Sequence, residues 1–173
     1  YETQMRGLAE GLRDPRVAEA LVNGQAKVLL MQWTGKSRQR VSIPWQVIGS
    51  FEDLDRLAYR IETTPRVWRN FSTAIGEAMT ALVPHMAAVD CGRRVIDISG
   101  DGQSNEGIAP EIARRELAAL SVTVNALVIE GIDDDLTGYF WEKVLVGEGA
   151  FVVTANGFQE YPEKIRRKLL REV

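Results

Sequence analysis

The stretch Arg93-Arg-Val-Ile-Asp-Ile-Ser-Gly-Asp-Gly102 decides how this 173-residue chain is interpreted. Residues 95–98 have the character of a β-strand, and they lead into a glycine-rich loop, 100–107. Open α/β sheets bind ligands beyond the carboxyl ends of their strands, where glycine permits a close approach and carboxylates offer hard oxygen donors. The stretch predicts either a binding loop at a sheet edge or an ordinary surface turn.

Composition and charge describe a globular chain that fits a single domain, residues 1–173. Hydrophobic residues make up 45% of the sequence and charged residues 26%, as in ordinary soluble folds. The net charge of −3 leaves no basic stripe, so we expect no nucleic-acid partner. No apolar run approaches the ~20 residues of a membrane span. One basic cluster is expected to be the solvated face of a C-terminal helix: Lys164, Arg166, Arg167, Lys168 and Arg171.

Two residue counts exclude some classes of site. Cys91 is the single cysteine, which excludes an internal disulfide and a cysteine-based zinc site. His85 is the single histidine, which argues against a His-rich metal centre or a Ser-His-Asp triad.

Hydrophobic periodicity predicts alternating strands and helices. Residues 26–34 and 39–43 read as a hairpin, the first strand covered on both faces and the second a polar edge strand that ends at Pro44. Further strands are expected at 95–98, 122–129 and 150–154, and helices near 5–12, 17–22, 54–61, 75–86, 110–120, 136–144 and 158–169. This order predicts an α/β, Rossmann-like doubly wound fold: a mostly parallel sheet with one antiparallel edge strand and helices on both faces.

Two local expectations concern the helix near 75–86. Ser72 or Thr73 is expected at or near its N-terminus, where hydroxyls cap free N–H groups. Pro84 is expected to kink or end it.

The order of a hairpin, a helix, the threonine of Phe71-Ser-Thr-Ala-Ile-Gly76, a strand and the Asp101-Gly102 loop resembles the von Willebrand factor A-type (vWA) domain. More narrowly, the chain resembles an uncharacterised bacterial family, DUF1194-like, through the phrase 93–102. It shares with that family a C-terminal strand–turn–helix unit, here with Asn156-Gly157-Phe158 at the turn.

The resemblance implies a metal-ion-dependent adhesion site (MIDAS). Thr73 would donate its hydroxyl oxygen to a divalent cation, Mg²⁺ or else Mn²⁺ or Ca²⁺, and Asp101 would face the cation directly or through water. Asp97, Ser72 and Asn105 are possible supports, and Ser72 stands where the family usually has glycine.

One departure from the family bears on the cation. The family's first strand carries Asp-x-Ser-x-Ser, which this sequence lacks, so the domain is expected to be truncated before Tyr1. Thr73 and Asp101 are too few ligands for Mg²⁺, which takes six oxygens in octahedral geometry. We therefore expect this chain to bind a divalent cation weakly or not at all.

The remaining candidates have two interpretations each. Asp97 alternates with Val95 and Ser99, which would bury its carboxylate. A structural hydrogen bond is favoured over support of the metal loop or a pairing with Arg93 or Arg94. Trp68 is expected either in the core or on a partner surface. A solvated acidic turn is favoured for Asp133, Asp134 and Asp135 over a second cation or partner surface.

Three functions follow. The first is a non-enzymatic module that binds an unidentified protein partner through the cation site. The alternatives are a Mg²⁺-dependent α/β hydrolase or phosphatase that uses Asp97 and Asp101, and a structural domain with a vestigial site. The resemblance also implies a signal peptide in the precursor and a periplasmic or secreted location, with the cytoplasm not excluded by these residues.

Overall fold

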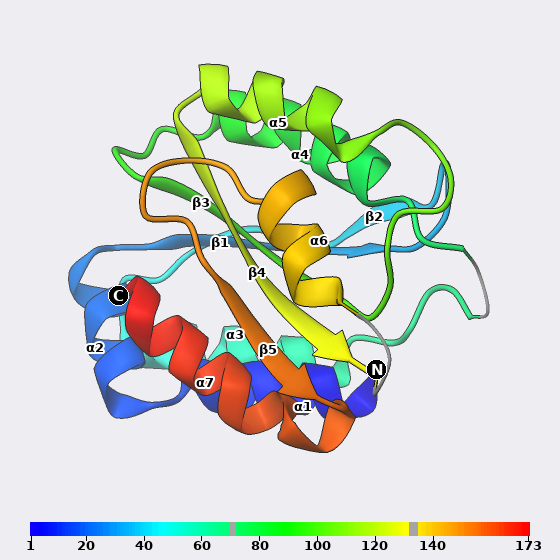
Figure 1. The fold of residues 1–173 in the computed structure, drawn as a ribbon. Helices are drawn as coiled ribbons and strands as arrows, with labels where there is room; N and C mark the ends of the chain where they lie inside the picture. Colours follow the sequence, from blue (N-terminus) through cyan, green and yellow to red (C-terminus); the bar gives the residue numbers. More distant parts are fainter. Residues whose placement is uncertain (70–71, 132–134) are drawn as a thin grey trace. The chain divides into compact units, whose positions relative to one another are not determined.

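The computed structural model describes residues 1–69, 72–131 and 135–173. They form two compact units. The first unit comprises 1–32, 40–67 and 157–173, and the second comprises 33–39 and 68–156. Figure 1 shows the course of the chain through both.

The first unit is a helical layer beside most of a hairpin. Its elements are α1 (Glu2–Leu12), α2 (Pro15–Asn23), α3 (Phe51–Thr63), the 3₁₀ turn η1 (Phe158–Glu160) and α7 (Tyr161–Glu172). Helix α1 packs against α3 and α7, as the blue and red helices of Figure 1 show. Glycines allow this approach, because a Cβ at Gly7 would lie 3.0 Å from the Cα of Pro162. The close packing buries Ala9, Leu12, Leu57 and Ile61.

Local polar contacts begin two of these helices. The Asp14 carboxylate accepts a hydrogen bond from the Arg16 N–H at 3.0 Å and starts α2. Ser50 accepts from the Asp53 N–H at 3.1 Å, and the Asp53 carboxylate returns to the Gly49 N–H at 3.1 Å. Ser50 is therefore the N-cap of α3, with a reciprocal arrangement close to a capping box.

The C-terminal helix corrects one expectation. Lys168 is only 1% exposed, and its ammonium lies 2.6 Å from the Glu172 carboxylate. The basic cluster is therefore not a uniformly solvated face, because the i,i+4 spacing turns Lys168 into the packed side of α7 with a carboxylate to pair it.

The hairpin consists of β1 (Lys27–Trp33) and β2 (Gln39–Val47), which form a two-stranded sheet. The end predicted at Pro44 is wrong, since β2 continues to Val47. An exposed edge strand tolerates proline, whose missing N–H need not join the ladder. Strand β1 is half-buried along most of its length rather than covered on both faces.

The second unit contains a three-stranded parallel sheet in the order β3-β4-β5. Its strands are β3 (Arg94–Gly100), β4 (Val122–Glu130) and β5 (Val152–Asn156). The central strand β4 is almost wholly buried, as its apolar run predicts. All three carboxyl ends lie at one edge, because Gly100 is level with Val128 and Glu130 with Asn156.

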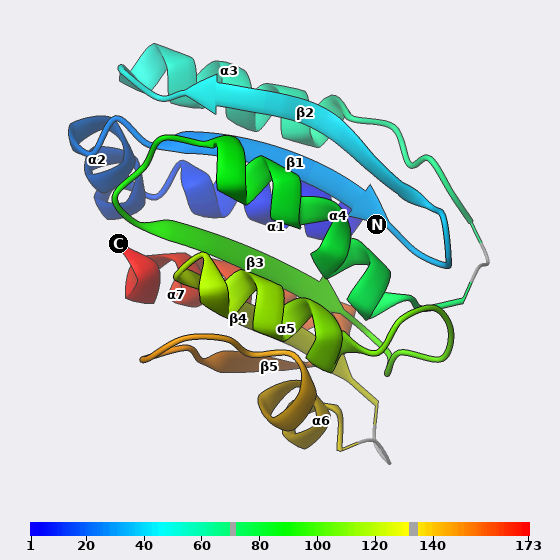
Figure 2. The same cartoon turned by 90° about the horizontal axis from the view of Figure 1, so that it is seen from above.

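Three helices complete the second unit: α4 (Ile75–Ala88), α5 (Pro110–Ala119) and α6 (Leu136–Lys143). Helices α4 and α5 pack together over one face of the sheet, as Figures 1 and 2 show. Helix α6 packs against β4 and β5, and Phe140 fits over Gly100, where a Cβ would lie 3.1 Å from its ring. Pro84 does not end α4, which runs on to Ala88.

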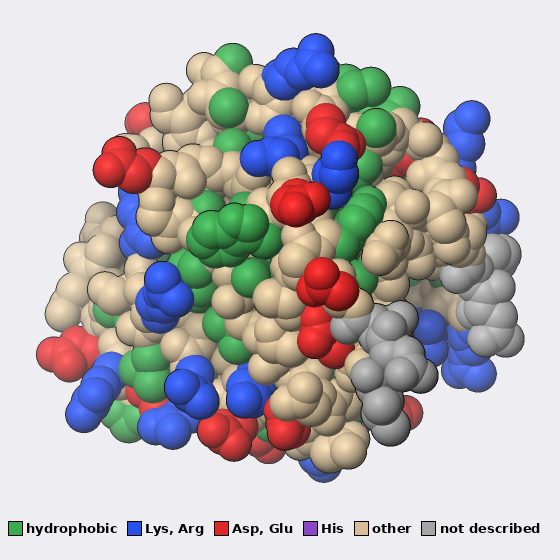
Figure 3. Space-filling view, in the orientation of Figure 1, with side chains coloured by type: hydrophobic (Ala, Val, Ile, Leu, Met, Phe, Trp, Pro, Cys, Tyr) green, Lys and Arg blue, Asp and Glu red, His purple; other side chains and the backbone are tan. Residues whose placement is uncertain are grey.

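These elements confirm the α/β, Rossmann-like fold class. The described strands pair as two sheets, the hairpin and the parallel sheet. Among the described residues no helix has the length and apolar character needed to cross a membrane. On the face shown in Figure 3, acidic and basic side chains are interspersed, without a stripe of one sign.

Candidate functional site

Three segments of the second unit meet beyond the carboxyl end of β3. They are the hairpin tip at 34–38, the start of α4 at 72–75, and the loop 101–107. They are far apart in sequence and are joined by hydrogen bonds that no local pattern would predict.

Asn105 binds the backbone of Thr73 twice. Its N–H donates to the Thr73 carbonyl at 2.9 Å, and its side-chain oxygen accepts from the Thr73 N–H at 2.9 Å. One residue of the loop after β3 therefore bonds both the N–H and the carbonyl of Thr73, and the Ser104 hydroxyl also donates to that carbonyl at 3.5 Å. This use of the Asn105 side-chain oxygen makes it a support for Thr73 rather than a spare ligand.

Ser104 caps helix α4, although it lies far from this helix in the sequence. Its hydroxyl accepts from the Ile75 N–H at 3.2 Å, and its own N–H donates to the Tyr139 hydroxyl at 3.2 Å. Ser72 and Thr73 lie just before α4, as expected, but the expected hydroxyl cap from them is wrong, because the N-cap is Ala74 and makes no side-chain cap. Ser104 is a positioning residue that the sequence did not reveal, since its cap contact spans 29 residues.

The Thr73 hydroxyl faces the Asp-Gly loop. A Cβ built on Gly102 would lie 3.5 Å from Thr73 Oγ1, which is ordinary contact. Asp101 is exposed, and Thr73 is half-buried. The structure thus brings together the two loops that the sequence paired, while the role of these two residues as cation ligands stays a prediction.

The hairpin tip supports the same start of α4. The Thr34 hydroxyl donates to the Ser72 carbonyl at 2.9 Å, and the Thr34 carbonyl accepts from the Ala74 N–H at 2.8 Å. Ser72 is therefore held by its backbone from one side, which leaves its hydroxyl for another partner.

That partner is Glu106. Its carboxylate accepts hydrogen bonds from the Ser72 hydroxyl and from the Lys36 backbone N–H. These two bonds and the nearby charges of Arg38 and Lys36 hold the pKa of the Glu106 carboxyl below its usual value. The sequence places Glu106 in the loop but gives it no role, because its partners lie 34 and 70 residues away along the chain.

Two glycines make the segments fit. A Cβ at Gly76 would collide with the carbonyl oxygen of Ile108, so α4 touches the loop backbone directly. A Cβ at Gly35 would collide with the Glu106 carboxylate and lie 2.7 Å from Ser72 Oγ. A larger residue at Gly76 would push two backbone segments apart, whereas at Gly35 it would displace the ends of the Glu106 and Ser72 side chains.

The other candidates take different places. Asp97 is exposed, so its expected burial is wrong; the neighbouring Arg94 donates to the Met86 carbonyl at 3.1 Å. Trp68 is half-buried. Asp135 is exposed and caps α6 through the Gly138 N–H at 3.0 Å, while Asp133 and Asp134 lie outside the described residues.

The donor set near Thr73 does not fit a divalent cation by itself. The described residues contain no group of three or more Asp, Glu, His or Cys side chains placed to hold a metal ion. Thr73 and Asp101 supply two oxygen ligands at most, and the Glu106 carboxylate is already hydrogen-bonded. Mg²⁺ takes six oxygens at 2.0–2.1 Å, so the described residues do not form a complete site.

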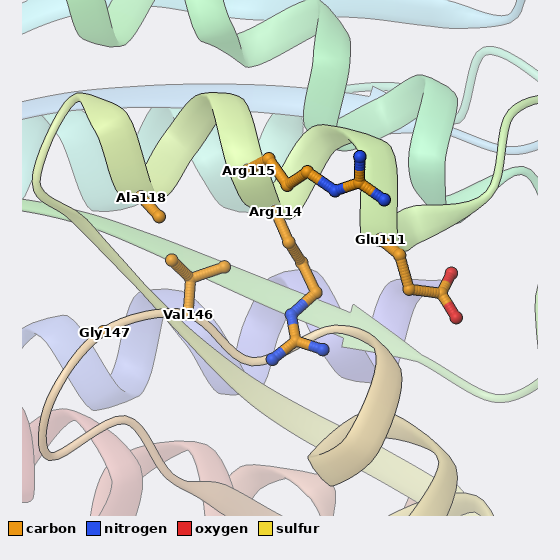
Figure 4. A pocket seen from close by; sticks show the side chains of 6 residues that line it. All are labelled: Glu111, Arg114, Arg115, Ala118, Val146 and Gly147. Carbon is orange, nitrogen blue, oxygen red and sulfur yellow. The ribbon is translucent and has the colours of Figure 1, made fainter.

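A surface hollow lies along α5. Its volume is about 370 Å³, and it is lined by Glu111, Arg114, Arg115, Ala118, Val146 and Gly147 (Figure 4). Glu111 pairs with Lys143 at 2.9 Å, which lowers the pKa of the Glu111 carboxyl and raises that of the Lys143 ammonium. None of the sequence-predicted site residues lines this hollow.

Comparison with known proteins agrees with the fold. The family described as "Protein of unknown function (DUF1194)" matches residues 1–173. No curated protein sequence matches the chain.

Solved structures share the fold at low sequence identity. Proximal thread matrix protein 1 from the mussel byssus has a TM-score of 0.72 at 16% identity, over 99% of this chain and 43% of that one. The same protein solved with a zinc-occupied MIDAS motif has a TM-score of 0.70 at 18% identity, with the same coverage. The von Willebrand factor type A structure from Catenulispora acidiphila has a TM-score of 0.68 at 15% identity, over 97% of this chain and 38% of that one. The chain therefore has the vWA fold and spans less than half the length of these proteins.

Proposed function

The chain belongs to the DUF1194 family of proteins of unknown function and has the vWA fold, and from this we propose that it is a protein-binding module. Its binding face is formed by the start of α4 and the loop 101–107. The observation that carries this proposal is the placement of the Thr73 hydroxyl against the Asp101-Gly102 loop. The backbone N–H and carbonyl of Thr73 are both hydrogen-bonded to Asn105. Such a preorganised polar rim is ready to receive a partner at little conformational cost.

A divalent cation has a secondary part in this proposal. Thr73 and Asp101 would face the cation, which would carry an acidic side chain of the partner. Because these residues are too few for tight binding, the affinity of this chain alone for Mg²⁺, Mn²⁺ or Ca²⁺ is expected to be weak. The remaining ligands would come from an Asp-x-Ser-x-Ser strand of the kind that the family resemblance implies.

The hydrolase alternative is weaker. Asp97 lies three residues before the end of β3 at Gly100, which is about 10 Å of extended chain. That separation disfavours one Mg²⁺ held by both Asp97 and Asp101. The structural domain with a vestigial site stays as the alternative that binding experiments must exclude. A periplasmic or secreted location stays a prediction from the resemblance.

The test combines titration with capture. Isothermal titration of the chain with Mn²⁺ is expected to show no binding in the micromolar range. Micromolar affinity would refute the proposal that this chain alone binds a divalent cation weakly. Capture of a protein partner is expected to require Mn²⁺ and to be lost in Thr73→Ala and Asp101→Ala. Thr63→Ala, in the exposed last turn of α3, is the matched control. Partner capture that survives both variants would refute the proposed face, and Mg²⁺-dependent phosphatase activity lost in Asp101→Ala would favour the hydrolase.

A further inference from the structure

The hairpin tip presents a set of hydrogen-bond donors to one carboxylate. The Lys36 backbone N–H and the Ser72 hydroxyl both donate to Glu106. The guanidinium of Arg38 belongs to the same place, since its Nη1 lies 3.5 Å from the Cβ position of Gly35, beside the Glu106 and Ser72 oxygens. We name these three groups, the Lys36 N–H, the Ser72 hydroxyl and the Arg38 guanidinium, the turn receptor.

The turn receptor is held in shape by its own backbone. The Arg38 N–H donates to the Gly35 carbonyl at 3.1 Å, the Thr34 N–H donates to the Arg38 carbonyl at 3.1 Å, and the Gln39 side chain donates to the Gly35 carbonyl at 3.0 Å. The absence of a side chain at Gly35 gives the carboxylate its space. The turn therefore positions the Lys36 N–H without help from Glu106.

The donor chemistry is that of an anion site. A backbone N–H, a hydroxyl and a guanidinium can all donate to one carboxylate, and charge-assisted hydrogen bonds of this kind are about twice as strong as neutral ones. Lys36 is exposed at the tip, and Glu106 is half-buried. The carboxylate is thus at the surface, where a group from another molecule can reach it.

From this geometry we propose that the turn receptor is a cation-independent binding site for an acidic side chain of a protein partner, and that Glu106 occupies it as an internal competitor. Ser72 precedes Thr73 in sequence, so the receptor belongs to the same face as the proposed function and adds the chemistry of the partner. The turn receptor requires no metal ion, so its test is independent of whether Thr73 and Asp101 face a cation.

An internal competitor lowers the apparent affinity in a calculable way. A ligand binds only the fraction of molecules in which the receptor is open, and its apparent dissociation constant rises in inverse proportion to that fraction. Removal of the Glu106 carboxylate opens the receptor in every molecule. The Glu106→Ala variant is therefore expected to bind carboxylates more tightly than the unchanged chain, by about tenfold if Glu106 occupies the receptor nine-tenths of the time.

The experiment follows the Lys36 amide resonance by NMR, in EDTA and at constant ionic strength. Acetate is expected to shift this resonance saturably in Glu106→Ala, and only at higher concentration in the unchanged chain. Acetamide, a neutral molecule of the same shape, is expected to leave it unmoved. Glu116→Ala, on an exposed part of α5, is the matched control and should behave as the unchanged chain.

Two further arms identify the source of the carboxylate and the receptor groups. The capped peptide acetyl-Gly-Glu-Gly-amide should shift the Lys36 amide in Glu106→Ala, and acetyl-Gly-Gln-Gly-amide should not. If acetate binds and the glutamate peptide does not, the site takes a small free carboxylate and the protein-partner proposal is overturned. The double variant Ser72→Ala/Glu106→Ala should lose most of the acetate affinity.

A second variant at position 106 covers the case in which Glu106→Ala does not fold. Glu106→Leu removes both carboxylate oxygens and keeps most of the side-chain volume, so it reports the same opening if Glu106→Ala does not fold. A folded variant of either kind whose Lys36 amide does not respond to acetate overturns the proposal. Because EDTA is present throughout, this result does not depend on whether Mn²⁺ binds near Thr73.

Discussion

Helices α3 and α4 begin in opposite ways. Helix α3 carries its own start signal, because Ser50 caps the Asp53 N–H and Asp53 returns a bond to Gly49. Helix α4 has alanine at its N-cap and receives its cap from Ser104, in another segment. One helix start is complete within five residues, and the other exists only when the loop after β3 is in place.

The difference teaches where a binding face can be built. A self-capped helix satisfies its N–H groups without help, so its start needs no contact with the rest of the protein. A helix start without a local cap must recruit polar groups from elsewhere. In the second unit the Ile75 N–H at the start of α4 binds Ser104. The next two loop residues, Asn105 and Glu106, bond Thr73 and Ser72 just before the helix.

The largest expected effect comes from separating α4 from that loop. Gly76→Ala places a Cβ against the Ile108 carbonyl, and since backbone cannot yield as a side chain does, we expect a loss of about 3 kcal/mol in the free energy of unfolding. Urea denaturation measures it. Gly92→Ala, where a Cβ meets nothing within 4 Å, is the matched control, and equal stability of the two variants would contradict the direct backbone contact.

Removal of each cap compares the two helix starts directly. Ser50→Ala is expected to cost about 1 kcal/mol, the usual cost of losing an N-cap. Ser104→Ala leaves the N–H of the buried Ile75 without its partner, so we expect about 2 kcal/mol. Urea denaturation of both variants gives the ranking. Hydrogen exchange shows where stability is lost, and the Ile75 amide is expected to exchange faster in Ser104→Ala alone. A larger loss of unfolding free energy in Ser50→Ala than in Ser104→Ala would contradict the expected ranking of the two caps.

The smallest expected effect is a change in acid sensitivity. The pKa of the Asp53 carboxyl is lowered chiefly by its hydrogen bond with Ser50. The pKa of the Glu106 carboxyl is lowered chiefly by its hydrogen bond with Ser72. A carboxyl with a lowered folded-state pKa stabilises the fold above its unfolded pKa, which is about 4, and this contribution is lost as the pH falls through the folded-state value.

Asp53→Asn and Glu106→Gln should therefore each flatten the decline in stability below about pH 4. The midpoint of urea unfolding, measured from neutral pH into this acid range, gives the slope, with Glu116→Gln as control. A variant slope as steep as that of the unchanged chain would show that the corresponding carboxyl does not contribute to acid sensitivity.

Some features of the molecule were predictable because they are local. The Ser50 cap, the buried strand β4 and the Pro110 start of α5 follow from capping chemistry, from an apolar run and from the fit of proline to a first helical turn. The paired loops of Thr73 and Asp101 were also predicted, through the family resemblance. The end of β2 at Pro44 was wrong, because the position of a strand in its sheet decides whether proline is tolerated there.

The sequence by itself determined the order of helices and strands and the family, because hydrophobic periodicity and a specific phrase are contained within short windows. Only the tertiary structure decided what surrounds Thr73. The exposure of Asp97, the distant cap from Ser104 and the occupation of the turn receptor by Glu106 depend on segments up to 70 residues apart. A polar side chain in a loop can serve many partners, and which one it meets is decided by where the chain brings the other loops.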